Sequence, residues 1–394
     1  MLVNIEFLSN EPIENTISSM YYKYDKVVFF CLQKELQNLG KSTQEFLIKY
    51  CNVKHVPIVY LKDEGMDESG IVAFYTAIRK VIEDEKEAGN DVVIDITGGN
   101  EMILVAFGML AKEFKLPVHL YDFTKKQFIE FATDDNDLNP YKAPVQNIVP
   151  TIDMMLEMYG CCIDYNQSGI SQYDYNDSFA EDIRNVFEIE KKYRKLWNTF
   201  THLARTNFIP NKNNDVEVSQ KQICTALSDK EFVRRGLTQG ILNKILKEMN
   251  KKGIITLSSL TQYYMFSYKN SNIPKLLGKE GNILEQYVLV EERAGLKQGM
   301  SGVMIDWDGH ISTPSDDVSN EIDVISLDGY TMTFISCKCG RLDANGARNA
   351  LYELDTVANR FGGKYVRKKL ALLDEIGETH LNRAKEMGIE IKYY

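Results

Sequence analysis

The sequence predicts an α/β protein of two or three domains. Its 394 residues are too many for one ordinary core. Apolar, β-rich runs alternate with amphipathic stretches in the first third of the chain, and helices and strands alternate again in the last third. With 44% hydrophobic and 26% charged residues, the composition is that of a globular chain.

The first segment, residues 1–145, is expected to be a Rossmann-like domain. We expect strands in five apolar runs: LVNIEFL, KVVFFCL, VKHVPIVYL, NDVVIDI and LPVHLYDF. Because strands this apolar are covered on both faces, the sheet should be mainly parallel, with crossover helices such as GIVAFYTAIRKVIEDEKEAG. An antiparallel edge strand is expected from Lys125, in KKQFIEFAT, where apolar and polar residues alternate. The domain should end in the polar, proline-containing stretch TDDNDLNPYKAPVQNIVP.

The second segment, residues 146–270, is expected to be a helical linker with a winged-helix-like part. Between Asn176 and Thr206, apolar residues recur at helical spacing without proline or glycine, which predicts one long amphipathic helix. Two short helices and a β-hairpin follow, in the order of a winged helix. A helical spacer with the same order is an open alternative, because the second helix offers few side chains that read bases.

The third segment, residues 271–394, is expected to be a restriction-endonuclease-like α/β domain. We expect a helix in GNILEQYVLVEERAGL and then three strands, in VMIDWDGHI, NEIDVISL and TMTFISCKCG. The prediction continues with a helix in ARNALYELDTVANRFGG, a strand in KKLALLDE, and a helix and strand in LNRAKEMGIEIKYY. Helix, three strands, helix and strand in this order are the skeleton of the restriction-endonuclease-like fold.

Composition excludes several classes of protein. No apolar run approaches the roughly 20 residues needed to cross a bilayer, and MLVNIEFLSN has no features of a secretory signal. We therefore expect a cytoplasmic protein that does not bind membranes. The seven cysteines lie mostly inside apolar patterns, as reduced buried thiols do. A net charge of -10 argues against a protein that coats nucleic acid, although a local basic channel remains compatible with it.

A polar rim is predicted at the carboxyl ends of two strands of the first domain. A buried strand runs into Thr97, Gly98, Gly99 and Asn100 and then directly into a helix, while the first strand ends at Ser9 and Asn10. Ligands of open α/β sheets lie beyond the carboxyl ends of strands, and free amides at a helix N-terminus attract phosphate. An ordinary βα turn is the alternative. The sequence has neither the G-x-G-x-x-G nor the Walker A motif, so NAD enzymes and P-loop ATPases are unsupported.

This strand-turn-helix resembles the signature of the CARF domain, the CRISPR-associated Rossmann fold, which binds cyclic oligoadenylates across a two-fold dimer axis. The resemblance implies a homodimer, and a ring of four adenylates has matching symmetry. It also implies that the ring contacts Ser9, Asn10, Thr97, Gly98, Gly99, Asn100 and Met102.

A second candidate site lies in the third segment. Glu321 and Asp323 share one face of a predicted strand, while Ser336 and Lys338 share a face of the next. A tight turn joins these strands and could bring Lys338 near Asp323. Hydrolysis of a phosphodiester needs carboxylates that hold a divalent ion and often a lysine. A solvated strand edge or a surface ion pair is the alternative for each residue.

This arrangement resembles the PD-(D/E)xK nuclease motif. The resemblance implies a metal-binding Asp323, the motif lysine at Lys338 and a helix-borne acid at Glu285. Ser336 stands where the motif usually has an acid, so Glu321, Glu285 or an aspartate of IDWDG could compensate. The implied cofactor is Mn²⁺ or Mg²⁺, held by Asp323, Glu285 and Glu321. Basic residues that could form a groove for phosphates follow the site: Arg348, Arg360, Lys364, Arg367, Lys368 and Lys369.

Together the two resemblances imply a CRISPR ancillary nuclease of type III systems, in which a CARF domain is fused to a PD-(D/E)xK-like domain. Such a protein is expected to be a homodimer that binds cyclic tetra-adenylate, rearranges, and cuts single-stranded DNA or RNA in antiviral defence. One alternative is a CARF-regulated winged-helix transcription factor with an inactive C-terminal domain. Another is a ring nuclease that degrades its own activator.

Overall fold

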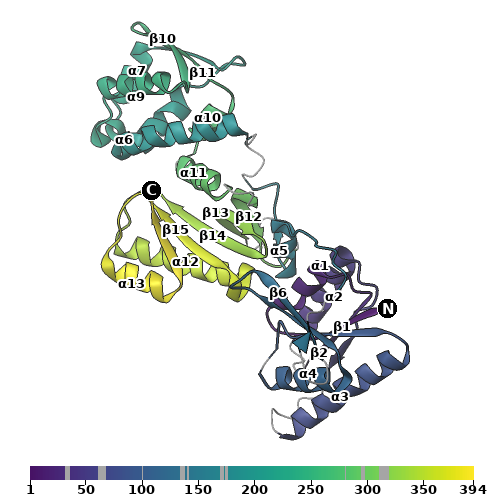
Figure 1. Ribbon diagram of the computed structural model, residues 1–394. Coiled ribbons are helices and arrows are strands. Elements are labelled where there is room, and N and C mark those ends of the chain that lie inside the picture. Colours follow the sequence, from purple (N-terminus) through teal and green to yellow (C-terminus); the bar gives the residue numbers. More distant parts are fainter. Residues whose placement is uncertain are drawn as a thin grey trace.

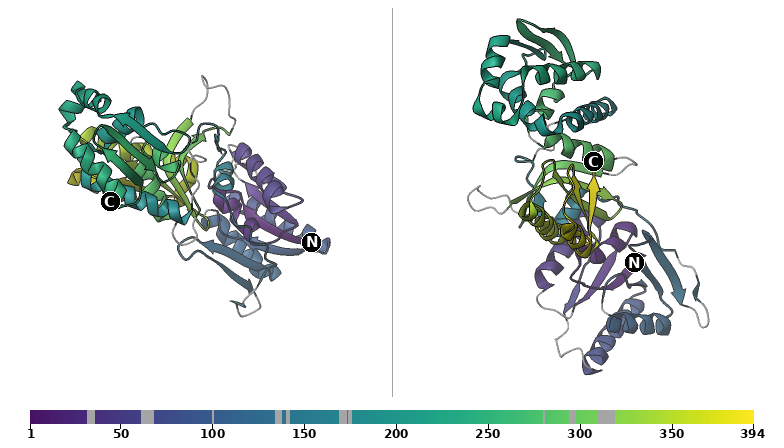
Figure 2. Two further views of the ribbon diagram at one scale, coloured as in Figure 1. Left: turned by 90° about the horizontal axis from the view of Figure 1, so that it is seen from above. Right: turned by 90° about the vertical axis from the view of Figure 1, so that its left-hand side faces the viewer.

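The chain folds into three parts, and the C-terminal part lies between the other two (Figures 1 and 2). Each part contains its own β-sheet, and the three sheets have seven, three and six strands. This computed structural model describes residues 1–31, 36–60, 68–99, 101–133, 138–139, 142–168, 173, 176–279, 281–293, 298–309 and 319–394.

The N-terminal sheet has the order β3-β2-β1-β4-β5-β6-β7. Its first five strands are parallel, and the last two are antiparallel to their neighbours. β1 is central, as the sequence indicates. The strands are β1 Leu2–Phe7, β2 Lys26–Cys31, β3 Ile58–Tyr60, β4 Asp91–Asp95, β5 Pro117–Asp122, β6 Gln127–Thr133 and β7 Leu138–Asn139.

Helices cover both faces of this sheet, and β2 carries apolar side chains on both sides. One face packs against the two helices that carry Phe74 and Phe107, and the other packs against the helices that carry Met20 and Phe46. The helices are the 3₁₀ helix Pro12–Asn15, α1 Ile17–Tyr21, α2 Gln37–Cys51, α3 Glu68–Glu87 and α4 Glu101–Phe114.

The middle part consists of helices around a small antiparallel sheet of order β10-β11-β9. The long helix expected between Asn176 and Thr206 forms, with non-helical backbone angles at Tyr193. Its elements are α6 Asp177–Asn207, β9 Asp215–Ser219, α7 Gln220–Leu227, α8 Lys230–Arg235, α9 Gln239–Lys251, β10 Ile255–Leu260, β11 Tyr263–Tyr268 and α10 Asn272–Leu276. Before them in the chain, α5 Ile152–Met158 and β8 Cys162–Ile163 pack with the other two parts.

The C-terminal part is a mixed sheet of order β16-β15-β14-β13-β12-β8. β12 to β14 are antiparallel, and β14 to β16 are parallel. Its elements are α11 Asn282–Glu292, β12 Gln298–Asp306, β13 Ser319–Asp328, β14 Thr331–Lys338, α12 Ala344–Gly362, the 3₁₀ helix Gly363–Tyr365, β15 Arg367–Leu372, α13 Glu378–Glu386 and β16 Ile389–Tyr393.

Two hydrophobic cores run through the molecule from opposite faces of the C-terminal sheet. One core continues from this sheet through α5 into the N-terminal domain, and it joins Phe334 to Phe29. The other continues through α11 and α6 into the winged-helix-like part, and it joins Ile335 to Ile245. Packing therefore connects the C-terminal sheet to both of the other parts.

The α/β class expected from the sequence is confirmed. The expected domain boundaries at 145 and 270 remain predictions. Part of the segment between them joins the C-terminal sheet, because β8 pairs with β12. Among the described residues, none of the helices combines the length and apolarity that crossing a membrane requires.

Candidate functional site

The carboxyl ends of β1 and β4 bring Ser9 next to Gly98. The two strands are parallel neighbours, paired from Leu2 with Asp91 to Ile5 with Ile94, so the loops that follow them lie together. A Cβ atom on Gly98 would lie 3.3 Å from the Cβ atom of Ser9. The two predicted rim segments therefore meet at this edge of the sheet.

The turn after β4 is fixed by bonds to its own side chains. The amide of Thr97 donates to Oδ1 of Asp95 at 2.6 Å, and the hydroxyl oxygen of Thr97 accepts the amide of Tyr121 at 2.9 Å. Although burial raises the pKa of Asp95, the neighbouring His119 lowers it to a net value below the ordinary range. Gly99 has a φ of +127°, which only glycine adopts readily.

The other predicted contact residues are more exposed. Asn10 lies on the surface of the loop after β1. Met102, on the first turn of α4, is 46% exposed. Asn100 lies outside the described residues. The part of the rim that the structure describes thus has a buried floor at Ser9 and Gly98 and an exposed edge at Asn10 and Met102.

Beneath the rim, Glu14 connects the N-terminal and C-terminal domains. Its Oε2 atom accepts the hydroxyl of Ser9 at 2.7 Å and would lie 3.0 Å from a Cβ atom on Gly98. Its Oε1 atom accepts the hydroxyl of Tyr365 at 2.6 Å and pairs with Nζ of Lys364 at 2.5 Å. Glu14 is 5% exposed. One buried side chain thus contacts both the rim and the C-terminal domain.

A second acid reinforces this junction. Oε2 of Glu11 accepts the backbone amide of Lys364 at 3.0 Å, and its Oε1 accepts the hydroxyl of Tyr159. The ring of Tyr365 stacks on Phe123 with centroids 3.6 Å apart. Movement of either acid would therefore be transmitted to the 3₁₀ helix that follows α12.

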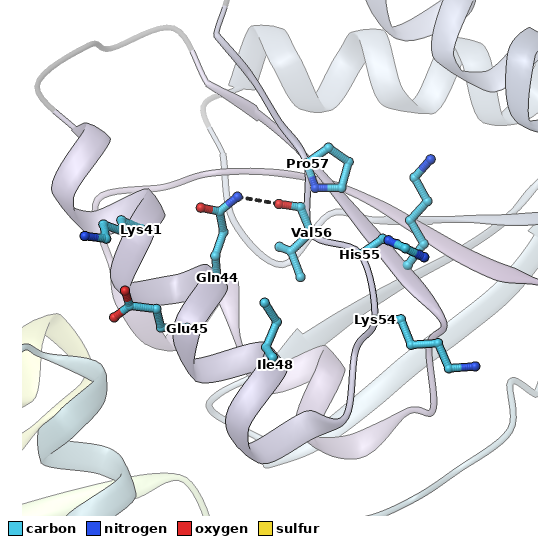
Figure 3. A pocket seen from close by; sticks show the side chains of 9 residues that line it. Lys41, Gln44, Glu45, Ile48, Lys54, His55, Val56 and Pro57 are labelled. Carbon is cyan, nitrogen blue, oxygen red and sulfur yellow. Dashed lines mark hydrogen bonds between the residues drawn. The ribbon is translucent and has the colours of Figure 1, made fainter.

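A cavity of about 660 Å³ lies elsewhere on the N-terminal domain, between α2 and the chain that enters β3 (Figure 3). It includes Lys26, the first residue of β2, and so lies at the amino ends of the parallel strands. The ammonium of Lys26 pairs with Glu85 at 2.5 Å, while Gln44 donates to the carbonyl of Val56. None of the rim residues lines it. The cavity is therefore separate from the rim.

The second candidate site lies on β13 and β14. Their pairing runs to Val324 with Ile335, so the next pair outward is Asp323 and Ser336. Oδ2 of Asp323 accepts the hydroxyl of Ser336 at 3.2 Å and the amide of Cys337 at 2.6 Å. The ammonium of Lys338 lies 3.8 Å from the same oxygen. The structure therefore brings together the predicted aspartate, serine and lysine.

Glu285 faces this cluster from α11. Burial, followed by the charge of Asp323, raises the pKa of Glu285 to about 7. The ammonium of Lys279 lies 4.0 Å from Glu285 and 2.7 Å from Glu321, and so acts as a counter-ion between the two acids. Sequence analysis missed Lys279 because it lies in a loop, where no periodicity assigns a direction to its side chain.

The chemistry of these groups fits a hard divalent cation. Magnesium and manganese prefer oxygen ligands, and Mg²⁺ is often held by one or two protein carboxylates together with water and substrate phosphate. Glu285 and Asp323 can provide two such carboxylates. Within the described ranges, no group of three or more His, Cys, Asp or Glu side chains is arranged to hold an ion. A two-carboxylate site completed by water is the arrangement that fits.

Four of the six basic residues expected to form a groove are bound within the protein instead. Arg360 donates to the carbonyls of Tyr159 and Trp307. Ion pairs join Lys364 to Glu14, Lys368 to Asp355 and Lys369 to Glu292. These four residues are close to the nuclease motif in the sequence, but their side chains connect elements of the fold. The side chain of Asp306, in IDWDG, also binds within its own loop, since its Oδ1 accepts the amide of Asp308.

Known proteins are similar to this chain in fold and, over residues 276–392, in sequence. Residues 276–392 match the family described as the Card1-like endonuclease domain. The crystal structure of protein VC1899 from Vibrio cholerae is similar, with a TM-score of 0.67, 15% identity, and coverage of 99% of this chain and 93% of that one. The structure of Can2 from Sulfobacillus thermosulfidooxidans in complex with cyclic tetra-adenylate has a TM-score of 0.61, 14% identity and the same coverages. No curated protein sequence matches the chain.

At this level of identity, the structural neighbours establish the shared fold, whereas the family match concerns the part that contains Glu285, Asp323 and Lys338. Residues 276–392 are therefore similar in sequence to the Card1-like endonuclease domain, and the whole chain shares its fold with Can2.

Proposed function

We propose that this protein is an endonuclease of type III CRISPR defence that is activated by a cyclic oligoadenylate, with cyclic tetra-adenylate as the favoured ligand. In this proposal the nuclease requires Mn²⁺ or Mg²⁺ and cuts single-stranded DNA, RNA or both. The observation that carries the proposal is the direct link, through Glu14, between the rim at Ser9 and the domain that carries Asp323. Can2, which shares the fold, was solved with cyclic tetra-adenylate bound.

The roles at the nuclease site follow from the geometry. Asp323 and Glu285 would hold the cation, which supplies Lewis-acid polarisation of the scissile phosphate. Ser336 and the amide of Cys337 fix one oxygen of Asp323, so the other oxygen is presented in a defined direction. Lys338 stabilises negative charge that builds up on the phosphate. Glu321 is the third proposed ligand, and in the structure its carboxylate pairs with Lys279.

In this proposal, the activator switches on the nuclease by competing with Glu14 for the hydrogen bond that the Ser9 hydroxyl donates. The hydroxyl proton is donated to Glu14, which also accepts Tyr365 and pairs with Lys364. A phosphate at the rim is a strong acceptor and a negative charge, so it competes for the same proton and repels Glu14. Glu14 must then change its contacts with the C-terminal domain. The ligand is thereby coupled to the nuclease without touching it.

The proposal also requires a two-fold dimer, since half a site cannot enclose a ring. α4 begins at the rim and exposes an apolar stripe at helical spacing, with Met102, Val105 and Met109 46%, 59% and 58% exposed. Apolar stripes of this kind usually mark an interface. A second copy of the chain on this face would place a second rim beside the first.

The test is cleavage of labelled single-stranded DNA and RNA in Mn²⁺ with each cyclic oligoadenylate in turn. We expect cleavage that depends on one ring size and is absent from an Asp323→Ala variant. Activator binding without cleavage of either substrate would instead support the transcription-factor alternative, and loss of the activator during incubation would support the ring nuclease.

A further inference from the structure

The three-stranded sheet of the middle part has the strand order of a winged helix. β9 precedes the helices, and β10 and β11 form the hairpin that follows them, yet β9 pairs with β11 and not with β10. α9 is the helix that directly precedes the hairpin. In helix-turn-helix proteins the corresponding helix contacts nucleic acid.

α9 has one buried apolar face and one exposed basic face. Leu242, Ile245, Leu246 and Met249 are buried in the core. The exposed face carries three lysines at positions i, i+3 and i+7, which lie on one side of a helix. They are Lys244, Lys247 and Lys251.

The acids near this face are already matched by other lysines. Glu248 pairs with Lys192 of α6 at 2.9 Å, and Glu188 pairs with Lys252. The three lysines of the exposed face have no ion pair with any described residue. The hydrogen bond from Lys192 lowers the pKa of Glu248 and the charge of Lys251 lowers it further, but that one acid already pairs with Lys192, so the face keeps a net positive charge.

The charge of the whole unit agrees with this local pattern. Residues 208–270 contain ten Lys and Arg against five Asp and Glu, whereas the complete chain has a net charge of -10. A positive unit in an acidic chain is the distribution expected when binding of a polyanion is confined to one surface.

The core connects this unit to the nuclease site. α6 packs against both α9 and α11, and α11 carries Glu285. Ile245 of α9 and Ile335 of β14 belong to one hydrophobic cluster. A polyanion held on α9 would thus be held in a defined position relative to the acids of the site.

From these observations we infer that the exposed face of α9 binds the phosphate backbone of nucleic acid, as a second contact for the substrate outside the nuclease site. The inference rests on the proposed function for the identity of the polyanion. Lysines on a helix that offers few base-reading groups predict binding that is insensitive to sequence. The occupant is a DNA or RNA strand that extends beyond the scissile bond.

The test uses the full chain with Lys244→Gln, Lys247→Gln and Lys251→Gln combined. A matched control carries Lys41→Gln, Lys80→Gln and Lys86→Gln, which remove the same charge from exposed positions of the N-terminal domain. Unchanged melting temperatures confirm that both variants fold. Fluorescence anisotropy in EDTA then gives the affinity for labelled single-stranded DNA, duplex DNA and single-stranded RNA over a series of salt concentrations.

We expect the α9 variant to bind more weakly than the wild type, with a shallower dependence of log K on log salt. The slope should fall by about 2 for single strands or about 3 for a duplex, from about 0.7 or 0.9 per lost contact. The control should keep the wild-type slope. In cleavage assays the α9 variant should raise KM while kcat stays constant, because uniform binding is lost.

Equal slopes and affinities for the α9 variant and the control would overturn the inference and leave the proposed nuclease function intact. The inference would also fail if poly-glutamate displaced the labelled strand as well as unlabelled DNA does, because the face would then belong to an acidic protein. A third outcome is nucleic-acid binding that depends on α9 without cleavage in the presence of any activator. That outcome would support the α9 binding surface and refute the proposed nuclease function.

Discussion

Glu14→Gln should separate binding of the activator from activation of the nuclease. A carboxylate offers two accepting oxygens, and here one accepts Ser9 while the other accepts Tyr365 and pairs with Lys364. Glutamine keeps the shape but has one accepting oxygen and one amide nitrogen that can only donate. The ion pair with Lys364 must therefore be lost, and the hydrogen bond to Ser9 or to Tyr365 must reverse its direction.

The structure sets the size of both effects. At an assumed separation of about 6 Å, a phosphate at the rim and the carboxylate of Glu14 would repel each other by about 3 kcal/mol at an effective dielectric constant of about 20. Removing the charge of Glu14 removes this repulsion, so binding should tighten by up to about 3 kcal/mol, or about 100-fold. Losing a charge-assisted hydrogen bond of about 1.5–3 kcal/mol should lower the activation ratio by about 10- to 100-fold.

Calorimetry with cyclic tetra-adenylate measures the affinity, and cleavage of a quenched fluorescent strand with and without the ligand measures the activation ratio. Glu45→Gln, an exposed change on the same domain, is the matched control and should alter neither quantity. If Glu14→Gln is activated as strongly as the wild type at saturating ligand, Glu14 does not couple the domains.

Three further predictions concern the nuclease site, a buried acid and the proposed dimer. Asp323→Ala and Lys338→Ala should each lower the rate of metal-dependent cleavage by roughly 100-fold or more, which corresponds to about 3 kcal/mol. Calorimetry should show unchanged affinity for the activator in both variants. Cleavage at the wild-type rate would refute the proposed roles of these residues. Glu190 is 2% exposed, and burial raises its pKa to about 8. Because the pKa is raised in the folded state, the wild type loses stability as pH rises from the unfolded pKa through about 8. The free energy of unfolding of Glu190→Gln, measured by denaturant titration, should therefore rise relative to that of the wild type by up to about 5 kcal/mol between about pH 4.5 and about pH 9. A difference between the two proteins that does not change with pH would contradict this. Met109→Asp should convert a dimer into a monomer by light scattering, because it places a charge in the apolar stripe of α4; a variant that stays dimeric would move the interface elsewhere.

The sequence predicted the parts of the fold that depend on local patterns. Apolar runs located the strands of the N-terminal sheet, and the period of two along β13 and β14 placed Asp323, Ser336 and Lys338 on matching faces. The tight turn between these strands fixed their register. A strand as short as β8 could not be predicted, because two residues carry no periodicity.

Contacts between distant parts of the chain were beyond prediction from sequence. Lys364 was assigned to a phosphate groove because it follows the nuclease motif, but in the structure it pairs with Glu14. The two residues are 350 positions apart, so no local pattern connects them. The junction was missed for the same reason, although Glu14 lies only five residues after Ser9.

The central claim is that a cyclic oligoadenylate switches on a nuclease whose site contains Asp323. The most direct measurement compares the single-turnover cleavage rate of the wild type with that of Asp323→Ala, each in Mn²⁺ with and without saturating cyclic tetra-adenylate. The account predicts that the ligand raises the wild-type rate strongly and that the variant, which binds the ligand equally well, stays at the unstimulated rate. Equal wild-type rates with and without every cyclic oligoadenylate, or full stimulation of Asp323→Ala, would contradict it.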